Sequence, residues 1–481
     1  MTADVERVSS GTPGLDRVLN GGFVRGQTTV VNGGPGTGKT VLALQFLAAG
    51  DSGLYIGFEE REEDLRRNAA ALGIDLSEVA VLDLSADGDR FFDGEEYTLF
   101  PSEEVEGEDL IGEIAAAIDE HAPDRLVVDP LSELRSLLPD DYRFRRNISS
   151  LVNEMKRREV TTLCTAQSGE GTDRDLQFLG DATVEIERTT DHRWLEVTKF
   201  RGSGFAGGRH TYRIHGGTGG QVYPKLAPGE HSRERERTRL GSGTAELDAL
   251  LGGGIERGSV TVVSGPSGVG KTTIGSLFLE AAAADGVRAQ GYLFEELRDD
   301  YLYRCDQLGM NVGERYEDGS LRLEEVESLQ RSADELAHDV RVAVEEEGVE
   351  LVMIDGIPGY RLGLRGDESA EELTRELHAL CRYLKRMGVT VILIDEVRNV
   401  TGDLTATDQQ ISYLADNIVF LRYMEVDGEI AKAVGVLKKR FGDFEQSLRS
   451  LAIDEGGVRV GDRLTGMRGI LTGIPERVDR D

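Results

Sequence analysis

The pattern G-x-x-x-x-G-K-T occurs twice in this 481-residue chain, and it restricts the possible folds more than any other feature. The two copies start 232 positions apart. They consist of Gly33, Gly34, Pro35, Gly36, Thr37, Gly38, Lys39 and Thr40, and of Gly265, Pro266, Ser267, Gly268, Val269, Gly270, Lys271 and Thr272. Each copy follows an apolar strand-like run (28–32, 260–264) and opens a helix-like run (41–49, 273–284), which is the context of a P-loop.

The residue types of such a loop explain why it binds phosphate. Glycines let backbone N–H groups converge on phosphate oxygens, and the helix N-terminus adds partial positive charge. The lysine reaches the β- and γ-phosphates, and the threonine hydroxyl binds Mg²⁺. A glycine-rich turn between a strand and a helix is the alternative for either loop. The matched second copy favours two ATP sites, with Thr40 and Thr272 as magnesium ligands.

The chain is too long for one ordinary core, and the P-loops divide it into two repeats of similar length. Similar openings at 11–23 and 241–255 indicate a tandem duplication. We expect domains at 1–228 and 240–481, joined by a charged linker at 229–239.

After each P-loop, short apolar runs alternate with longer amphipathic stretches, which predicts an α/β fold. The runs predict a mainly parallel central sheet flanked by helices, and the β-rich ends at 182–214 and 417–453 predict added antiparallel strands. We interpret the acidic segment 85–108 as a surface insertion, with a partner-docking loop as the alternative.

The formal net charge is −33, from 88 acidic and 55 basic residues. A surface this acidic repels nucleic acid and anionic membranes, so neither is an expected partner. Only nine of the basic residues are lysines, which suggests a halophilic protein adapted to a high-salt cytoplasm. Molar salt would weaken the charge argument through screening, and a merely acidic protein is the alternative.

Other composition features point to a cytoplasmic protein without a membrane span. The chain has no run of 18 apolar residues and no secretory leader pattern. Cys164, Cys305 and Cys381 lack metal-ligand spacing, so we predict buried apolar thiols.

A Phe-Glu-Glu tripeptide follows the second predicted strand of each repeat, and its acids are Glu59, Glu60, Glu295 and Glu296. One glutamate of each pair could orient and deprotonate the attacking water, while the other tunes or holds it. Acids that begin a helix are also a common stabilising feature, but their recurrence in both repeats favours catalysis.

Asp129 and Asp355 each end an apolar run, at the strand ends where open α/β sheets bind ligands. We predict that they hold Mg²⁺, with capping of the next turn as the alternative. Gln167 follows another strand and could sense the γ-phosphate, or could be an ordinary strand-end amide.

Late in each repeat, a Lys-x-Arg sequence lies in a strand-like context, at Lys199 and Arg201 and at Lys438 and Arg440. Alternate residues of a strand project to one face, so each pair could contact a phosphate. Because no nearby segment of the repeat supplies that phosphate, the nucleotide of a neighbouring subunit is the expected target. A solvated basic strand edge is the alternative.

Together these residues resemble the KaiC branch of the RecA-like ATPases over nearly the whole chain. The resemblance implies two tandem RecA-like P-loop domains, and two-tiered hexameric rings with ATP between subunits. The Lys-x-Arg residues would then act in trans. In the clock member of the family, the second domain phosphorylates an adjacent Ser-Thr pair. Here Ser412 remains as a possible phosphosite, but Tyr413 replaces the threonine, and a serine that caps a helix is the alternative.

A further departure is Phe441, which stands where the first repeat has Gly202. We favour Mg²⁺-dependent ATP hydrolysis by a homo-oligomer that signals to another protein. One alternative is a serine/threonine kinase or autokinase, with Ser412 as an acceptor. A DNA recombinase or helicase motor is a second, although no basic, glycine-rich loop with interleaved aromatics is visible. A third is a scaffold in which ATP only joins subunits.

Overall fold

The computed structural model describes residues 5–85, 103–133, 141–167, 179–190, 192–233, 238–327, 329–364, 369–397, 409–426, 428–465, 467–468 and 476–477. The chain divides into two units, Met1–Lys225 and Leu226–Asp481. Most of the predicted acidic insertion, residues 86–102, lies outside the described residues, and its end belongs to a helix.

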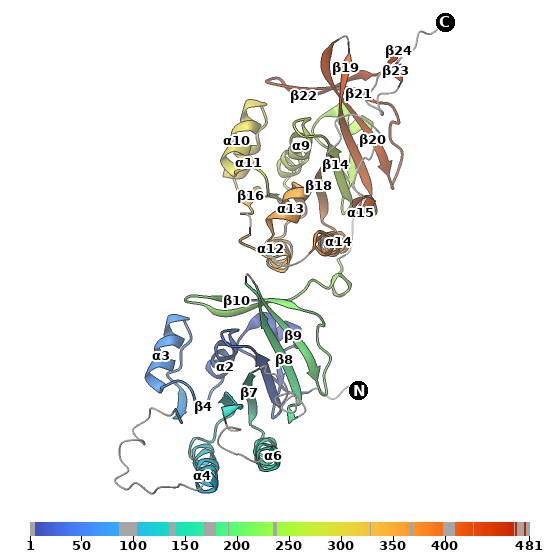
Figure 1. Ribbon diagram of the computed structural model, residues 1–481. Helices are drawn as coiled ribbons and strands as arrows, with labels where there is room; N and C mark the ends of the chain where they lie inside the picture. The colour runs from blue at the N-terminus through green and yellow to red at the C-terminus, as the bar shows by residue number, and fades with distance from the viewer. Residues whose placement is uncertain are drawn as a thin grey trace. The chain divides into compact units, whose positions relative to one another are not determined.

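The first unit is built on one nine-stranded sheet (Figure 1). Its elements are β1 (Arg7–Val8), α1 (Pro13–Val18), β2 (Phe23–Val24), β3 (Thr28–Gly33), α2 (Lys39–Ala48), β4 (Gly53–Gly57), α3 (Glu62–Ala71), β5 (Val79–Asp83), α4 (Glu103–His121), β6 (Arg125–Asp129), α6 (Asp141–Arg157), β7 (Thr161–Gln167), β8 (Ala182–Arg188), β9 (Arg193–Phe200), β10 (His210–His215) and β11 (Gly219–Tyr223). The strand order is β11-β10-β9-β8-β3-β7-β6-β4-β5.

The second unit repeats this arrangement. Its elements are η3 (Pro228–Glu230), β12 (Arg239–Leu240), α8 (Ala245–Leu250), β13 (Ile255–Glu256), β14 (Val260–Gly265), α9 (Lys271–Ala284), β15 (Ala289–Leu293), α10 (Arg298–Gln307), α11 (Val312–Glu317), β16 (Leu321–Glu325), α12 (Ala333–Glu345), β17 (Leu351–Asp355), α13 (Ile357–Gly363), α14 (Ala370–Arg386), β18 (Thr390–Glu396), α15 (Gln409–Ser412), β19 (Asn417–Val426), β20 (Glu429–Lys439), β21 (Arg449–Asp454), β22 (Gly457–Arg463), β23 (Met467–Arg468) and β24 (Glu476–Arg477). The order of its large sheet is β16-β15-β17-β18-β14-β19-β20-β21-β22.

The α/β prediction is confirmed, including the mainly parallel sheets. In each large sheet, the strands from one edge to β8 or β19 are parallel, and the remaining strands are antiparallel. The first strand of each predicted antiparallel region therefore pairs in parallel with the P-loop strand, β3 or β14. The P-loop strand is the fifth of nine in both sheets. Neighbouring strands on both sides therefore hold its ends in place.

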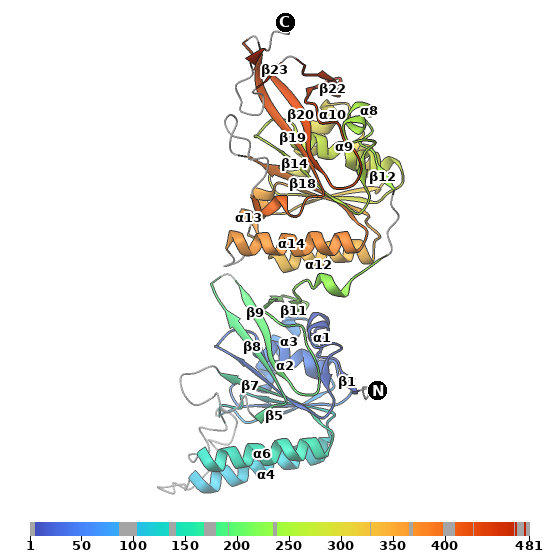
Figure 2. The same cartoon turned by 90° about the vertical axis from the view of Figure 1, so that its right-hand side faces the viewer.

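Each sheet is covered by helices on both faces (Figure 2). Neighbouring residues of a strand point to opposite faces. Val31 therefore packs in a core with Leu42 of α2, whereas Val30 packs in a second core with Phe144 of α6. In the second unit, the core around Phe278 of α9 and the core around Leu377 of α14 likewise lie on opposite faces of the sheet.

Helix α14 has clear boundaries in the sequence. Ser369 and Glu372 form a capping box at its N-terminus. Its buried apolar residues recur at helical spacing, at Leu373, Leu377, Leu380 and Leu384. Lys385 and Arg386 end the helix, where cations interact favourably with the helix dipole.

Part of the segment predicted as a linker packs against the second unit. The backbone N–H of Arg233 donates to the carbonyl of Arg386, at 3.0 Å. The His231 ring lies edge-on to Tyr383, with 5.0 Å between ring centroids. All three cysteines are buried and free, as predicted. Across the part of the chain that is described, no helix is long and apolar enough to cross a membrane.

Candidate nucleotide-binding sites

Both P-loops depend on glycine at equivalent positions. Gly36 and Gly268 have φ of 69° and 72°, and Gly38 and Gly270 have φ of 102° and 111°. Only glycine adopts these angles without strain, and a Cβ on Gly38 would lie 2.5 Å from Cδ1 of Ile214. The loops therefore wrap closely around the N-termini of α2 and α9, where free N–H groups can bind an anion.

The P-loop lysines are nearly buried and lie over their own loops. Lys39 Nζ donates to the carbonyls of Gly33 and Gly34, both at 2.9 Å, and its exposed fraction is 9%. Lys271 Nζ donates to the carbonyl of Pro266 at 2.9 Å and lies 3.7 Å from Glu396. Burial lowers the pKa of both lysines, while the nearby acids oppose this change. Each loop thus holds a partly desolvated cation, whose attraction for phosphate is strengthened.

The two predicted magnesium acids have different partners. Asp355 ends β17, and the Thr272 hydroxyl donates to its carboxylate at 3.0 Å. Burial raises the pKa of Asp355 to about 7. Asp129 ends β6 and accepts hydrogen bonds from Tyr55, at 2.9 Å, and from Thr165.

The second domain thus brings a threonine and a carboxylate oxygen together, and both are ligands that Mg²⁺ takes. Among the residues with described side chains, no group of three or more His, Cys, Asp or Glu could hold a metal. A magnesium ion would therefore need phosphate oxygens as well, as is usual in nucleotide sites. These residues fit such an ion.

The first glutamate of each pair faces the P-loop site. Glu59 accepts a hydrogen bond from Gln167 at 3.2 Å. Burial raises the pKa of Glu59, and the charge of Asp129 adds to the effect, while Lys39 opposes it. Burial and the charge of Glu396 likewise raise the pKa of Glu295. These shifts move both carboxyls toward the range that suits a general base at neutral pH.

The second glutamate of each pair is bound elsewhere. Glu60 accepts a hydrogen bond from Asn68, and Glu296 forms two hydrogen bonds with Arg304, at 3.1 and 2.8 Å. In both domains the partner lies eight positions later in the chain, on the helix that follows. The two adjacent glutamates of each pair therefore have different surroundings, which the sequence alone did not distinguish.

The sequence interpretation missed Glu396. Gln167 is the register partner of Gly33, and Glu396 is the register partner of Gly265, so the two side chains end equivalent strands. Aligning Thr165-Ala166-Gln167 with Ile394-Asp395-Glu396 could have identified Glu396.

The Lys-x-Arg residues lie at the opposite end of each sheet from the P-loop. The backbone N–H groups of Arg201 and Arg440 donate to the carbonyls of Asp181 and Asp416, both at 2.9 Å. Lys199 Nζ donates to the carbonyl of Gly180, at 2.6 Å.

The carboxylates of Asp181 and Asp416 accept the N–H groups of Thr28 and Val260, at 3.2 and 3.1 Å. Thr28 and Val260 are the first residues of the P-loop strands. Lys438 Nζ donates to the carbonyl of Ser412, at 2.9 Å, so the possible phosphosite lies at this end too. The structure thus groups the P-loop, Asp355 and Glu295 at one end, and the predicted trans cations at the other.

The mainly parallel sheet, the P-loop and the acids at the strand ends define a RecA-like nucleotide-binding domain, present twice. The KaiC ATPase family model matches residues 8–227 and 240–465, so the chain belongs to the KaiC family of ATPases. Its domains are therefore of an ATP-binding type.

Two relatives match almost end to end. The "Circadian clock protein KaiC3" of Synechocystis sp. is 27% identical over 498 residues, which cover 98% of this chain and 95% of that protein. The "Circadian clock oscillator protein KaiC" of Thermostichus vulcanus is 26% identical over 507 residues, which cover 100% and 94%.

The different placement of the two glutamates gives a prediction. The double variant Glu59→Gln with Glu295→Gln should keep ATP but lose about 10²- to 10⁴-fold in turnover, because a general base is removed. The matched control, Glu60→Gln with Glu296→Gln, should lose less than about 10-fold, since these carboxylates face the following helix. Phosphate release measures both, and wild-type turnover in the first variant would remove Glu59 and Glu295 from the mechanism.

Proposed function

We propose that this chain is an oligomeric Mg²⁺-dependent ATPase, which hydrolyses ATP at subunit interfaces and signals its nucleotide state to another protein. Membership of the KaiC ATPase family supports ATP binding and hydrolysis. Both relatives described above are named as circadian clock proteins, which supports a regulatory role over a purely metabolic one.

The residues at the P-loop end have separate roles in this proposal. The sixteen P-loop residues bind the nucleotide, and Lys39 and Lys271 neutralise its β- and γ-phosphates. Thr40 and Asp129, and Thr272 and Asp355, would hold Mg²⁺, which when bound supplies charge neutralisation at the phosphates. The fit is better supported in the second domain, where Thr272 and Asp355 are in contact.

Hydrolysis requires a base for the attacking water. The water oxygen forms a bond to the γ-phosphorus, and the bond between that phosphorus and the bridging oxygen of ADP breaks. Glu59 or Glu295 accepts the water proton, and the raised pKa of each carboxyl suits this role. Gln167, which donates to Glu59, would hold that carboxylate in place.

The position of the Lys-x-Arg residues is the observation that carries the oligomer proposal. Arg201 and Arg440 are anchored beside the first residue of the P-loop strand, and the P-loop follows its last residue. A six-residue strand separates the two points by about 17 Å, at roughly 3.3 Å per residue. No arginine side chain spans that distance to the nucleotide of its own domain, which supports a contact with the nucleotide of another subunit.

The proposed contact joins two unlike surfaces, the P-loop end of one subunit and the cationic end of the next. Such head-to-tail contacts close into rings or continue as filaments. We favour the six-fold ring that the family resemblance implies, with Lys199, Arg201, Lys438 and Arg440 acting in trans.

A mixing experiment tests the trans arrangement. Variant A carries Lys39→Ala and Lys271→Ala, and variant B carries methionine in place of the four Lys-x-Arg cations. Each should be inactive alone, although B should keep bound nucleotide. An equal, randomly exchanged mixture should regain about a quarter of wild-type turnover, because about one interface in four joins an intact P-loop to intact cations.

Phosphate release after subunit exchange gives the measurement, and re-mixing variant A with itself is the control. Wild-type turnover by variant B alone, or a mixture with no recovered activity although both variants assemble, would contradict the proposal.

Transfer of phosphate to Ser412 is a second candidate activity. Ser412 lies beside Lys438, at the end of the domain where the neighbour's nucleotide is proposed to reach. If transfer occurs, intact-mass measurement after incubation with ATP should show one added phosphate that Ser412→Ala removes. An unmodified chain that nevertheless releases phosphate would leave hydrolysis as the only reaction.

A further inference from the structure

A hollow of about 370 Å³ lies at the amino end of β14 in the second domain, beside α14. Four cationic side chains and one histidine line it, namely Arg382, Lys385, Arg386, Arg440 and His378. Its other lining residues are Val260, Cys381, Tyr413 and Leu414, so no acid lines it among the residues whose side chains are described. This is unusual in a chain with 88 acidic and 55 basic residues.

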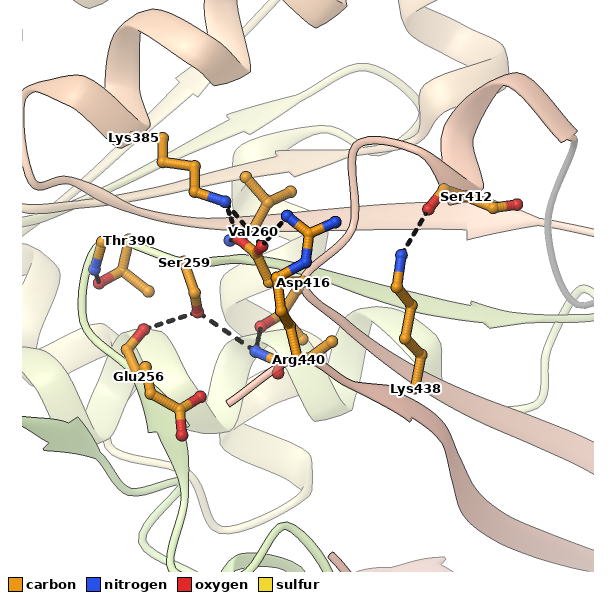
Figure 3. Close-up of polar contacts among 12 residues, drawn as sticks. Glu256, Ser259, Val260, Lys385, Thr390, Ser412, Asp416, Lys438 and Arg440 are labelled. Carbon is orange, nitrogen blue, oxygen red and sulfur yellow. Dashed lines mark hydrogen bonds and ion pairs between the residues drawn. The ribbon is translucent and has the colours of Figure 1, made fainter. Parts of the chain in front are cut away.

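Two of these cations are held in place by one buried carboxylate (Figure 3). Asp416 has an exposed fraction of 0% and accepts the N–H of Val260. Its two oxygens lie 2.6 and 2.5 Å from Nζ of Lys385, and one lies 3.1 Å from Arg440. One negative charge therefore fixes two positive charges, and the cluster keeps a net positive charge.

The fixed cations remain accessible. The side chains of Lys385 and Arg440 are 25% and 48% exposed, so both still meet solvent at the hollow. Arg382 and Arg386 are exposed as well, and Arg386 donates to the carbonyl of Gly229 at 3.4 Å. Burial, reinforced by the charge of Arg382, lowers the pKa of His378.

The first domain has the same anchor without the full set of cations. The Asp181 carboxylate accepts a hydrogen bond from the N–H of Thr28 and forms an ion pair with Nζ of Lys156, at 2.8 Å. The guanidinium of Arg201 lies 4.0 Å from the same carboxylate. Lys156 therefore corresponds to Lys385.

His378 and Arg382 lie seven and three positions before Lys385. The residues at the same distances before Lys156 in the first domain are Ser149 and Asn153. Residues three and seven positions before Lys385 share its face of a helix. The second domain thus has a cation and an imidazole that the first lacks, beside an anchor that both domains contain.

We propose that this hollow is a binding site for a phosphate group, formed by Arg382, Lys385, Arg386 and Arg440. Guanidinium groups bind phosphate through paired N–H donors, and an ammonium adds a point charge. The volume lies within the range of small-molecule sites, roughly 300–1,000 Å³. The inference deepens the proposed function, because Arg440 belongs both to this site and to the trans cations.

The phosphate cannot belong to the nucleotide of the same domain. Val260 lines the hollow, whereas the P-loop follows Gly265 at the other end of β14, about 17 Å away at roughly 3.3 Å per residue. Two sources offer the same chemistry, namely the nucleotide of a neighbouring subunit and a free phosphate or diphosphate.

The direct test is a calorimetric titration of inorganic pyrophosphate into the full chain that carries Lys39→Ala and Lys271→Ala. These changes weaken both P-loops, so the hollow should dominate. We expect one saturable site per chain, and at least about 10-fold weaker binding when Arg382→Gln and Arg386→Gln are added, because two of four cations are lost. Arg375→Gln is the matched control, since Arg375 is an exposed arginine of α14 that pairs with Glu371 and does not line the hollow.

Three results would overturn the inference. They are the absence of saturable binding, equal binding with and without the two glutamines, and equal weakening by the Arg375 control. Arg382→Lys with Arg386→Lys keeps the charges but loses the paired N–H donors. It should bind more weakly than the parent and more tightly than the glutamine variant, which separates a lost site from a misfolded domain.

A second arm identifies the source of the phosphate. Arg382→Gln with Arg386→Gln is placed in a chain with intact P-loops, and bound nucleotide and phosphate release are measured. Lower turnover with unchanged nucleotide content assigns the hollow to the neighbour's nucleotide. Unchanged turnover, with pyrophosphate binding lost in the first arm, assigns it to a free anion. If the proposed ATPase proves inactive, the pyrophosphate titration still decides whether the site exists.

Discussion

One buried carboxylate in each domain fixes the geometry on which the proposed mechanism depends. Asp181 and Asp416 bind the first N–H of the P-loop strand, and their backbone carbonyls accept the N–H of Arg201 and Arg440. A charge-assisted hydrogen bond contributes about 1.5–3 kcal/mol. One central strand therefore joins the phosphate loop to the anchored arginine and holds them about 17 Å apart, at roughly 3.3 Å per residue, which is farther than an arginine side chain of the same domain reaches.

The two domains share this frame but differ around the nucleotide. In the first, Gln167 donates to Glu59; in the second, the equivalent residue is Glu396, which lies 3.7 Å from Lys271. The neutral amide of Gln167 adds no charge to the first site, whereas the carboxylate of Glu396 adds a negative charge beside Lys271 and raises the pKa of Glu295. This difference supports a division of labour, in which the two sites bind and turn over ATP with different efficiency.

The sequence predicted the features that depend on local chemistry. The P-loops, the strand ends at Asp129 and Asp355 and the α/β class follow from glycine spacing, apolar periodicity and repetition. It could not predict contacts between distant segments. The contact between Lys271 and Glu396 and the hydrogen bonds of the two anchoring aspartates arise only when the sheet forms. Tertiary packing, which local patterns do not encode, places these side chains.

The central claim is that a nucleotide site is complete only when two subunits meet. The most direct measurement follows mass in solution and phosphate release per chain together, over a dilution series with ATP and Mg²⁺. We predict that ATP promotes assembly and that turnover per chain falls in step with the loss of oligomer, while each monomer keeps bound nucleotide. Full turnover by a monomer that stays monomeric with ATP would contradict the account.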